Sequence, residues 1–183
     1  MNYDSLMGPL FTVPFFYTKI SPWKEVKDKI LSIVEDQPYE MDDQGFKTDF
    51  FTKNSYSKEV YEIIKPYVKS IVCKHITSVF PEEVPDIWTQ KYYARSEHSV
   101  HNHGNRGLSF ILYLKFNPKV HKGTVFYAPF DDIFTGNTIA FSPDIQEGDL
   151  IAFPSVIKHS SQYQTSDEER MILSFNLFPD GPV

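Results

Sequence analysis

Short apolar runs separated by turn residues fill the second half of this chain, and they constrain its fold more than any other feature. From Trp88 onward, eight runs of strand length recur, with Gly, Pro, Asn, Asp or Ser around them. The runs are WTQKYYA, SVHNH, LSFILYLKF, GTVFYA, TIAFSP, DLIAFP, SSQYQT and RMILSFNLF. Runs of this length and spacing are typical of a β-sandwich or jelly roll. The pattern therefore predicts a double-sheet β domain in this half of the chain.

The first half carries a different pattern, in which apolar residues recur at helical spacing. Residues 9–20 predict an edge strand, because the proline inside them cannot donate a hydrogen bond to a neighbouring strand. A helix should follow, with Ser21 as its N-cap and Pro22 at its first helical position. A longer apolar stripe over residues 57–79 predicts a second helix, which Pro66 should kink or split.

These patterns together predict an α+β, mainly β protein. A length of 183 residues suits one domain, residues 1–183, in which a helical lead-in with an edge strand (1–87) packs on one sheet of a jelly-roll core (88–183). The net charge of −6 argues against a nucleic-acid partner, which would require a basic surface. The single cysteine, Cys73, fits a reducing compartment. With no convincing signal peptide or membrane span, we expect a cytoplasmic protein without a membrane partner.

Three histidines of the β half have the order and spacing of a metal site. His101 and His103 end one apolar run, and side chains two residues apart in a strand point to the same face. His159 follows a later run and could supply a third ligand from another strand. Non-haem Fe(II) oxygenases use three such ligands on one face of the metal, usually two histidines and a carboxylate. Imidazole also suits Zn, Cu and Ni, so the ligand set alone does not name the metal.

Arg170, at the start of the last run, favours iron with an organic co-substrate. A 2-oxoglutarate molecule can chelate Fe(II) through one end, and its far carboxylate then needs a fixed cation such as a bidentate guanidinium. Ser174 has the same strand parity as Arg170 and could donate to the same carboxylate. The alternative is that Arg170 belongs to a solvated charge cluster at a turn.

The remaining polar residues of this half have weaker claims. We expect His98 and His121 to be exposed or in loops. Glu97 lies about 13 Å along the strand from His101, too far to share a metal. Two further acidic residues, Asp131 and Asp132, stand in a separate predicted loop. Asn105 has the right parity to neighbour the metal.

At these residues the chain resembles the 2-oxoglutarate/Fe(II)-dependent dioxygenase superfamily, in particular its prolyl-hydroxylase-like branch and small phage and bacterial oxygenases. The segments that carry the resemblance are HNHGNRGLSFILYL, KGTVFY, GDLIAFPSVIKH and EERMILSFN, over residues 88–178. The resemblance implies a double-stranded β-helix, His101, His103 and His159 as iron ligands, and Arg170 as the anchor of 2-oxoglutarate. It also implies a co-substrate contact from Tyr92, with Tyr93 as the second choice and an aromatic core pair as the alternative.

The chain departs from the broader superfamily at His103, where the usual motif has Asp or Glu. A neutral imidazole there leaves the iron centre one charge more positive. The leading hypothesis is an Fe(II)- and 2-oxoglutarate-dependent oxygenase that uses O2 to hydroxylate a C–H bond of an unknown second substrate, such as a protein or peptide. We expect Leu112, Phe126 and Phe153 to line its dry interior, and a loop over 128–143 to act as a lid or substrate contact. The alternatives are a three-histidine cupin-like dioxygenase and a non-catalytic jelly-roll metal-binding module.

Overall fold

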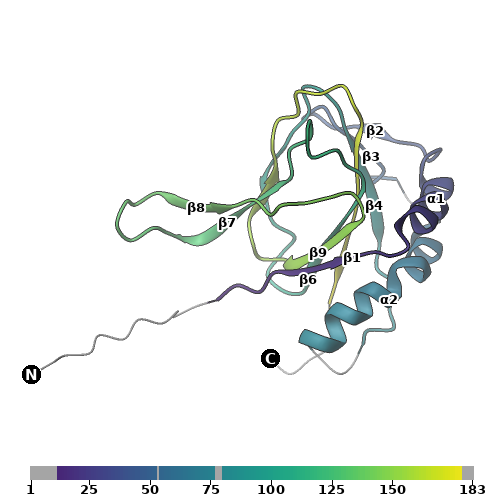
Figure 1. The fold of residues 1–183 in the computed structure, drawn as a ribbon, viewed down its shortest axis with the longest axis horizontal. Helices are drawn as coiled ribbons and strands as arrows, with labels where there is room; N and C mark the ends of the chain where they lie inside the picture. Colours follow the sequence, from purple (N-terminus) through teal and green to yellow (C-terminus); the bar gives the residue numbers. More distant parts are fainter. Residues whose placement is uncertain (1–11, 53, 77–79, 179–183) are drawn as a thin grey trace, which may run out of the picture.

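The computed structural model describes residues 12–52, 54–76 and 80–178, and Figure 1 shows how they are arranged. Each of the eight predicted runs overlaps one of the strands β4 to β11, so the mainly β fold is confirmed. The elements are β1 (Phe16–Lys19), α1 (Trp23–Val34), β2 (Glu40–Met41), β3 (Lys47–Thr48), α2 (Ser57–His75), β4 (Ile87–Tyr92), β5 (His98–His101), β6 (Leu108–Lys115), β7 (Thr124–Asp131), β8 (Thr138–Phe141), β9 (Asp149–Pro154), β10 (His159–Ser161) and β11 (Arg170–Leu177).

The strands form two antiparallel sheets. The larger sheet has the order β1-β9-β6-β11-β4-β3-β2, and the smaller has the order β5-β10-β7-β8. The predicted edge strand is confirmed for Phe16–Lys19, because β1 lies at one edge of the larger sheet. Residues 9–11 of that prediction lie outside the described residues. Both helices pack on the outer face of the larger sheet (Figure 1), and the smaller sheet faces its inner side.

The interior strand β6 of the larger sheet is buried on both faces, because it lies between the helices and the smaller sheet. Its alternate residues divide between two cores. Ile111 and Tyr113 face the smaller sheet, whereas Leu112 packs toward the helices. The prediction that Leu112 lines the interior was therefore wrong by one strand position, and that single position reverses the face. Phe126 and Phe153 lie in the core between the sheets, as predicted.

One local helix prediction needs correction, and a second is narrowed. The helix α1 begins at Trp23, one residue late, because Pro22 has an extended backbone (ψ 121°) and no side-chain cap bond forms. The helix α2 is one element through Pro66, so the predicted alternative of a split is excluded, whereas a kink there stays a prediction. Pro66 and Glu62, whose carbonyl would receive the missing hydrogen bond, both lie on the exposed face, where water can replace that bond. The predicted end of this helix at 77–79 lies outside the described residues.

The predicted loop over 128–143 is largely a β-hairpin. β7 and β8 pair from Phe126↔Phe141 to Asp131↔Thr138, and Asp132 closes the turn by accepting hydrogen bonds from Thr135. Figure 1 shows this hairpin, which belongs to the smaller sheet, projecting beyond the other strands. Within the described ranges, neither helix is long and apolar enough to cross a membrane.

Candidate active site

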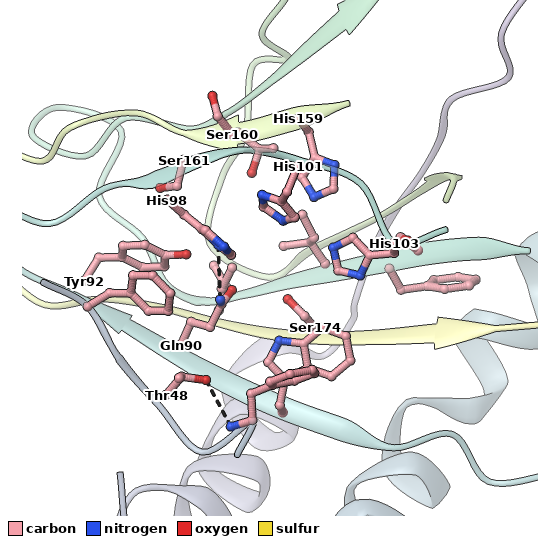
Figure 2. A pocket seen from close by; sticks show the side chains of 18 of the residues that line it. Thr48, Gln90, Tyr92, His98, His101, His103, His159, Ser160, Ser161 and Ser174 are labelled. Atoms are coloured by element: carbon pink, nitrogen blue, oxygen red, sulfur yellow. Dashed lines mark hydrogen bonds between the residues drawn. The ribbon is translucent and has the colours of Figure 1, made fainter. Parts of the chain in front are cut away.

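Three imidazoles converge between the two sheets. His101 ends β5, and His159 begins β10 directly opposite it in register. His103 lies two residues beyond β5, where its backbone N–H donates to the Ser155 carbonyl (2.9 Å). One ring nitrogen from each histidine lies within 4.8 Å of the other two, and Figure 2 shows the three rings facing one another. Among the described residues, no other group of histidine, cysteine or acidic side chains meets at this spacing.

Hydrogen bonds fix the orientation of two of these rings. His101 Nδ1 donates to the Ser99 carbonyl (2.7 Å), and His159 Nδ1 donates to the Ile157 carbonyl (3.0 Å). Each bond assigns the proton to Nδ1 and leaves the Nε2 lone pair free to bind a metal. Each ring is therefore oriented by the carbonyl of the residue two positions before it, and both rings present Nε2 as the metal-binding atom.

Burial keeps the three imidazoles uncharged at neutral pH. Desolvation, together with a smaller effect of the neighbouring histidines, lowers the pKa of His159 to about 3 and that of His103 to about 4. Burial also lowers the pKa of His101. Only a neutral imidazole can bind a metal, so no proton has to be removed before a cation enters.

Arg170 lies fully buried at the far end of the same cavity. Its guanidinium packs over the ring of Tyr92 (4.6 Å), and its Nη1 donates to Ser161 Oγ (2.7 Å). Its Nε and Nη2 have no hydrogen-bond partner among the described residues. A buried cation with two unsatisfied donors is costly, and a carboxylate that accepted from both would remove that cost. The arginine is not part of a solvated charge cluster.

The cavity between the histidines and Arg170 has a volume of about 410 Å³. Alternate residues of β11 face into it, so the predicted period of two is observed for Arg170, Ile172, Ser174 and Asn176. Tyr92 also lines it, whereas Tyr93 donates to Glu169 outside it. The cavity thus brings the three histidines, Arg170, Tyr92 and Ser174 to one site.

Two residues of this cavity, His98 and Ser161, were not predicted from the sequence. His98 lines the cavity and is half-buried, because a β-bulge gives β5 one extra residue between the partners of His159 and Ser161. The bulge puts His98 on the same side as His101, three residues later, which strand parity would forbid. Ser161 accepts a hydrogen bond from Arg170 Nη1, a contact that was not predicted, and only its position two residues after His159 could have suggested it.

The positions of other polar residues test the remaining predictions. Asn105 is exposed and does not line the cavity, whereas Asn176 lines it and accepts a hydrogen bond from Ser109 Oγ (2.8 Å). His121 lies in the loop between β6 and β7, one of the two alternatives predicted for it, but it is buried. Its Nδ1 accepts from the Asn117 N–H and its Nε2 donates to the Glu168 carbonyl. No carboxylate joins the three histidines in the described residues, and neither Glu97 nor Asp131 and Asp132 line the cavity.

Several solved structures share the fold of this chain. A *Pseudomonas putida* prolyl-4-hydroxylase is 13% identical, with a TM-score of 0.65 over 93% of this chain and 95% of that one. HygX from *Streptomyces hygroscopicus*, with nickel, 2-oxoglutarate and hygromycin B bound, is 11% identical, with a TM-score of 0.66 over 92% and 84%. A *Trichoplax adhaerens* prolyl hydroxylase in complex with a hypoxia-inducible-factor peptide is 14% identical, with a TM-score of 0.63 over 90% and 83%. No curated protein sequence matches the chain.

The class of protein follows from the family that the sequence matches. Residues 86–176, about half of the chain, match the family described as "Putative 2OG-Fe(II) oxygenase". The chain belongs to the 2-oxoglutarate/Fe(II)-dependent oxygenase superfamily, as the resemblance implied, and is an oxidoreductase whose cofactors are Fe(II) and 2-oxoglutarate. The residues present fit both groups: three neutral imidazoles suit Fe(II), and the two free donors of Arg170 suit a carboxylate.

Proposed function

We propose that this chain is an Fe(II)- and 2-oxoglutarate-dependent hydroxylase in which His101, His103 and His159 hold the iron. Arg170 binds the far carboxylate of 2-oxoglutarate. The observation that carries the proposal is one cavity with three convergent imidazoles at one end and a buried arginine with two free donors at the other. A cupin-like dioxygenase has no need of such an arginine, and neither does a structural metal site.

The protein side chains supply binding, orientation and exclusion of water. Bound Fe(II) would supply the activation of O2, which oxidises 2-oxoglutarate to succinate and CO2 and delivers one oxygen atom to a C–H bond. Arg170 fixes the co-substrate in a single direction, because its fork can accept a carboxylate only at the free Nε and Nη2 edge. Tyr92 and Ser174 line the same chamber and offer hydroxyl donors to that carboxylate. Phe153 and Ile172 make the remaining wall apolar, which limits side reactions with water.

The second substrate enters at the aromatic mouth of the cavity. Phe50 and Phe51 are exposed there (56% and 65%), and Trp88 stacks on the ring of His103 (5.7 Å between centroids). Such a mouth suits an apolar group beside the carbon that is oxidised. A peptide that presents a small apolar ring or side chain is one substrate of this kind, by analogy with the peptide-bound *Trichoplax* relative. No residue of 128–143 lines the cavity, so a lid role for the hairpin stays a prediction.

Succinate formation tests the proposal directly. The purified full chain is incubated with 2-oxoglutarate, O2 and Fe(II), and succinate is measured with and without each component. We expect slow succinate production, uncoupled from any second substrate, that requires all three and is lost in H159A. H75F is the control, because His75 is exposed at the end of α2, away from the cavity. Succinate formation that persists in H159A would refute the assigned iron site.

A further inference from the structure

His98 is a fourth imidazole in the cavity, and the three-histidine site does not account for it. The centroid of its ring lies 3.9 Å from the ring centroid of His101 and 4.8 Å from that of Phe46. The His98 and His101 rings are nearly parallel. The β-bulge in β5 turns it inward, as described above. A bulge next to a binding site commonly serves to re-aim a side chain, so the position of His98 calls for a role.

His98 belongs to a column of rings that joins the two ends of the cavity. Arg170 lies over Tyr92, Tyr92 stacks on Phe46 (5.1 Å), Phe46 contacts His98, and His98 stacks on His101. All five side chains line the cavity, and Figure 2 shows His98 between Tyr92 and His101. A molecule that reached from the metal to Arg170 would lie along this column. Because His98 stacks directly on His101, it flanks the half of that molecule nearest the metal.

Hydrogen bonding determines which nitrogen of His98 carries the proton. The amide nitrogen of Gln90 lies 3.4 Å from His98 Nδ1, and an amide N–H2 can only donate, so Nδ1 accepts. The neutral ring therefore carries its proton on Nε2. This Nε2 has no hydrogen-bond partner among the described residues. Unlike Nε and Nη2 of Arg170, it is not fully buried by other protein atoms. It is a free N–H donor on a side chain that lines the cavity.

We propose that His98 is a co-substrate-binding residue, which donates from Nε2 to the chelating half of 2-oxoglutarate. The inference rests on the proposed function and assigns a second contact at the opposite end of the molecule from Arg170. A neutral donor suits this position, because the all-histidine metal site already carries one positive charge more than a site with a carboxylate. Phe46 and Gln90 hold the ring of His98 in place.

Calorimetric titration of 2-oxoglutarate into the Fe(II)-loaded full chain, without O2, tests the proposal. H98F keeps the stacked column and removes the donor, so we expect the Kd for 2-oxoglutarate to rise about tenfold or more. The Kd for Fe(II) should stay within about threefold, because none of the three assigned ligands changes. H98Q restores an N–H donor and should recover part of the lost affinity. H75F is the matched control for replacing a histidine with phenylalanine.

The possible outcomes separate this inference from the proposed function. If the wild-type chain does not bind 2-oxoglutarate at all, the proposed function fails. If the wild-type chain binds and H98F binds equally well, only the role of His98 fails. A parallel loss of Fe(II) affinity in H98F would mean that His98 merely supports His101, and it would overturn the proposal. So would an H98Q protein that binds 2-oxoglutarate as weakly as H98F.

Discussion

Replacing Arg170 with methionine should separate the stability of the protein from its affinity for the co-substrate. Without 2-oxoglutarate, Arg170 is a fully buried cation with one hydrogen bond and two free donors. Each unsatisfied buried donor costs about 1–3 kcal/mol, and removing a poorly compensated buried charge is often neutral or stabilising. We therefore expect the free energy of unfolding of R170M, without ligand, to fall by no more than about 1 kcal/mol. The methionine fills much of the space over Tyr92.

The affinity for 2-oxoglutarate should fall by much more than the stability. Removing one partner of a buried, hydrogen-bonded charge pair costs about 2–5 kcal/mol, so the Kd of R170M should rise roughly 30- to 5,000-fold. Urea unfolding measures the first effect and calorimetry in the presence of Fe(II) measures the second. R106M is the control, because Arg106 is exposed and should leave both unchanged. The reasoning is refuted if R170M binds within threefold of wild type, or if it loses several kcal/mol of stability without ligand.

Three further changes test other parts of the structure. H103D should retain Fe(II), whereas H103A should lose most of it by metal analysis; full iron occupancy in H103A would exclude position 103 as a ligand. Burial raises the pKa of Glu147, but hydrogen bonds from Lys27 and other groups outweigh burial and lower this pKa below its usual value. The ionised Glu147 carboxylate should therefore stabilise the fold above about pH 4.3, and this stabilisation should be lost as the pH falls through the lowered pKa. E147Q should flatten that acid-side loss in unfolding experiments, and D28N, which removes an exposed pair in α1, should not. G107A should lower the free energy of unfolding by about 2 kcal/mol or more, because φ is +87° and a methyl group would meet a ring carbon at 2.6 Å; an unchanged midpoint would contradict this.

The sequence predicted the strands well because their burial leaves a simple pattern. In β11, Arg170 and Ser174 face the cavity while Leu173 faces the helices, as a period of two requires. The pairing of His101 with His103 was predicted from the same rule, yet β5 ends at His101. His103 is held instead by its backbone bond to Ser155. The expected pair meets, but for a different physical reason.

The sequence could not predict features that depend on register shifts and on distant partners. His98 faces the cavity only because of a bulge, and no local pattern marks that extra residue. His121 was expected to be exposed or in a loop, and it lies in a loop but is buried. Its ring is held there by the backbone groups of Asn117 and Glu168, which lie far apart in the chain. The contact between Ser161 and Arg170 likewise depends on how the two sheets face each other.

The most direct test of the central claim is a titration of 2-oxoglutarate into the full chain with and without Fe(II), in the absence of O2. The convergence of three imidazoles opposite Arg170 predicts one bound 2-oxoglutarate per chain when Fe(II) is present, with affinity at least tenfold weaker when it is removed. The metal and the arginine hold opposite ends of one molecule, so neither should suffice alone. No binding in the presence of Fe(II), or equal binding without it, would contradict the assignment of this cavity as the active site.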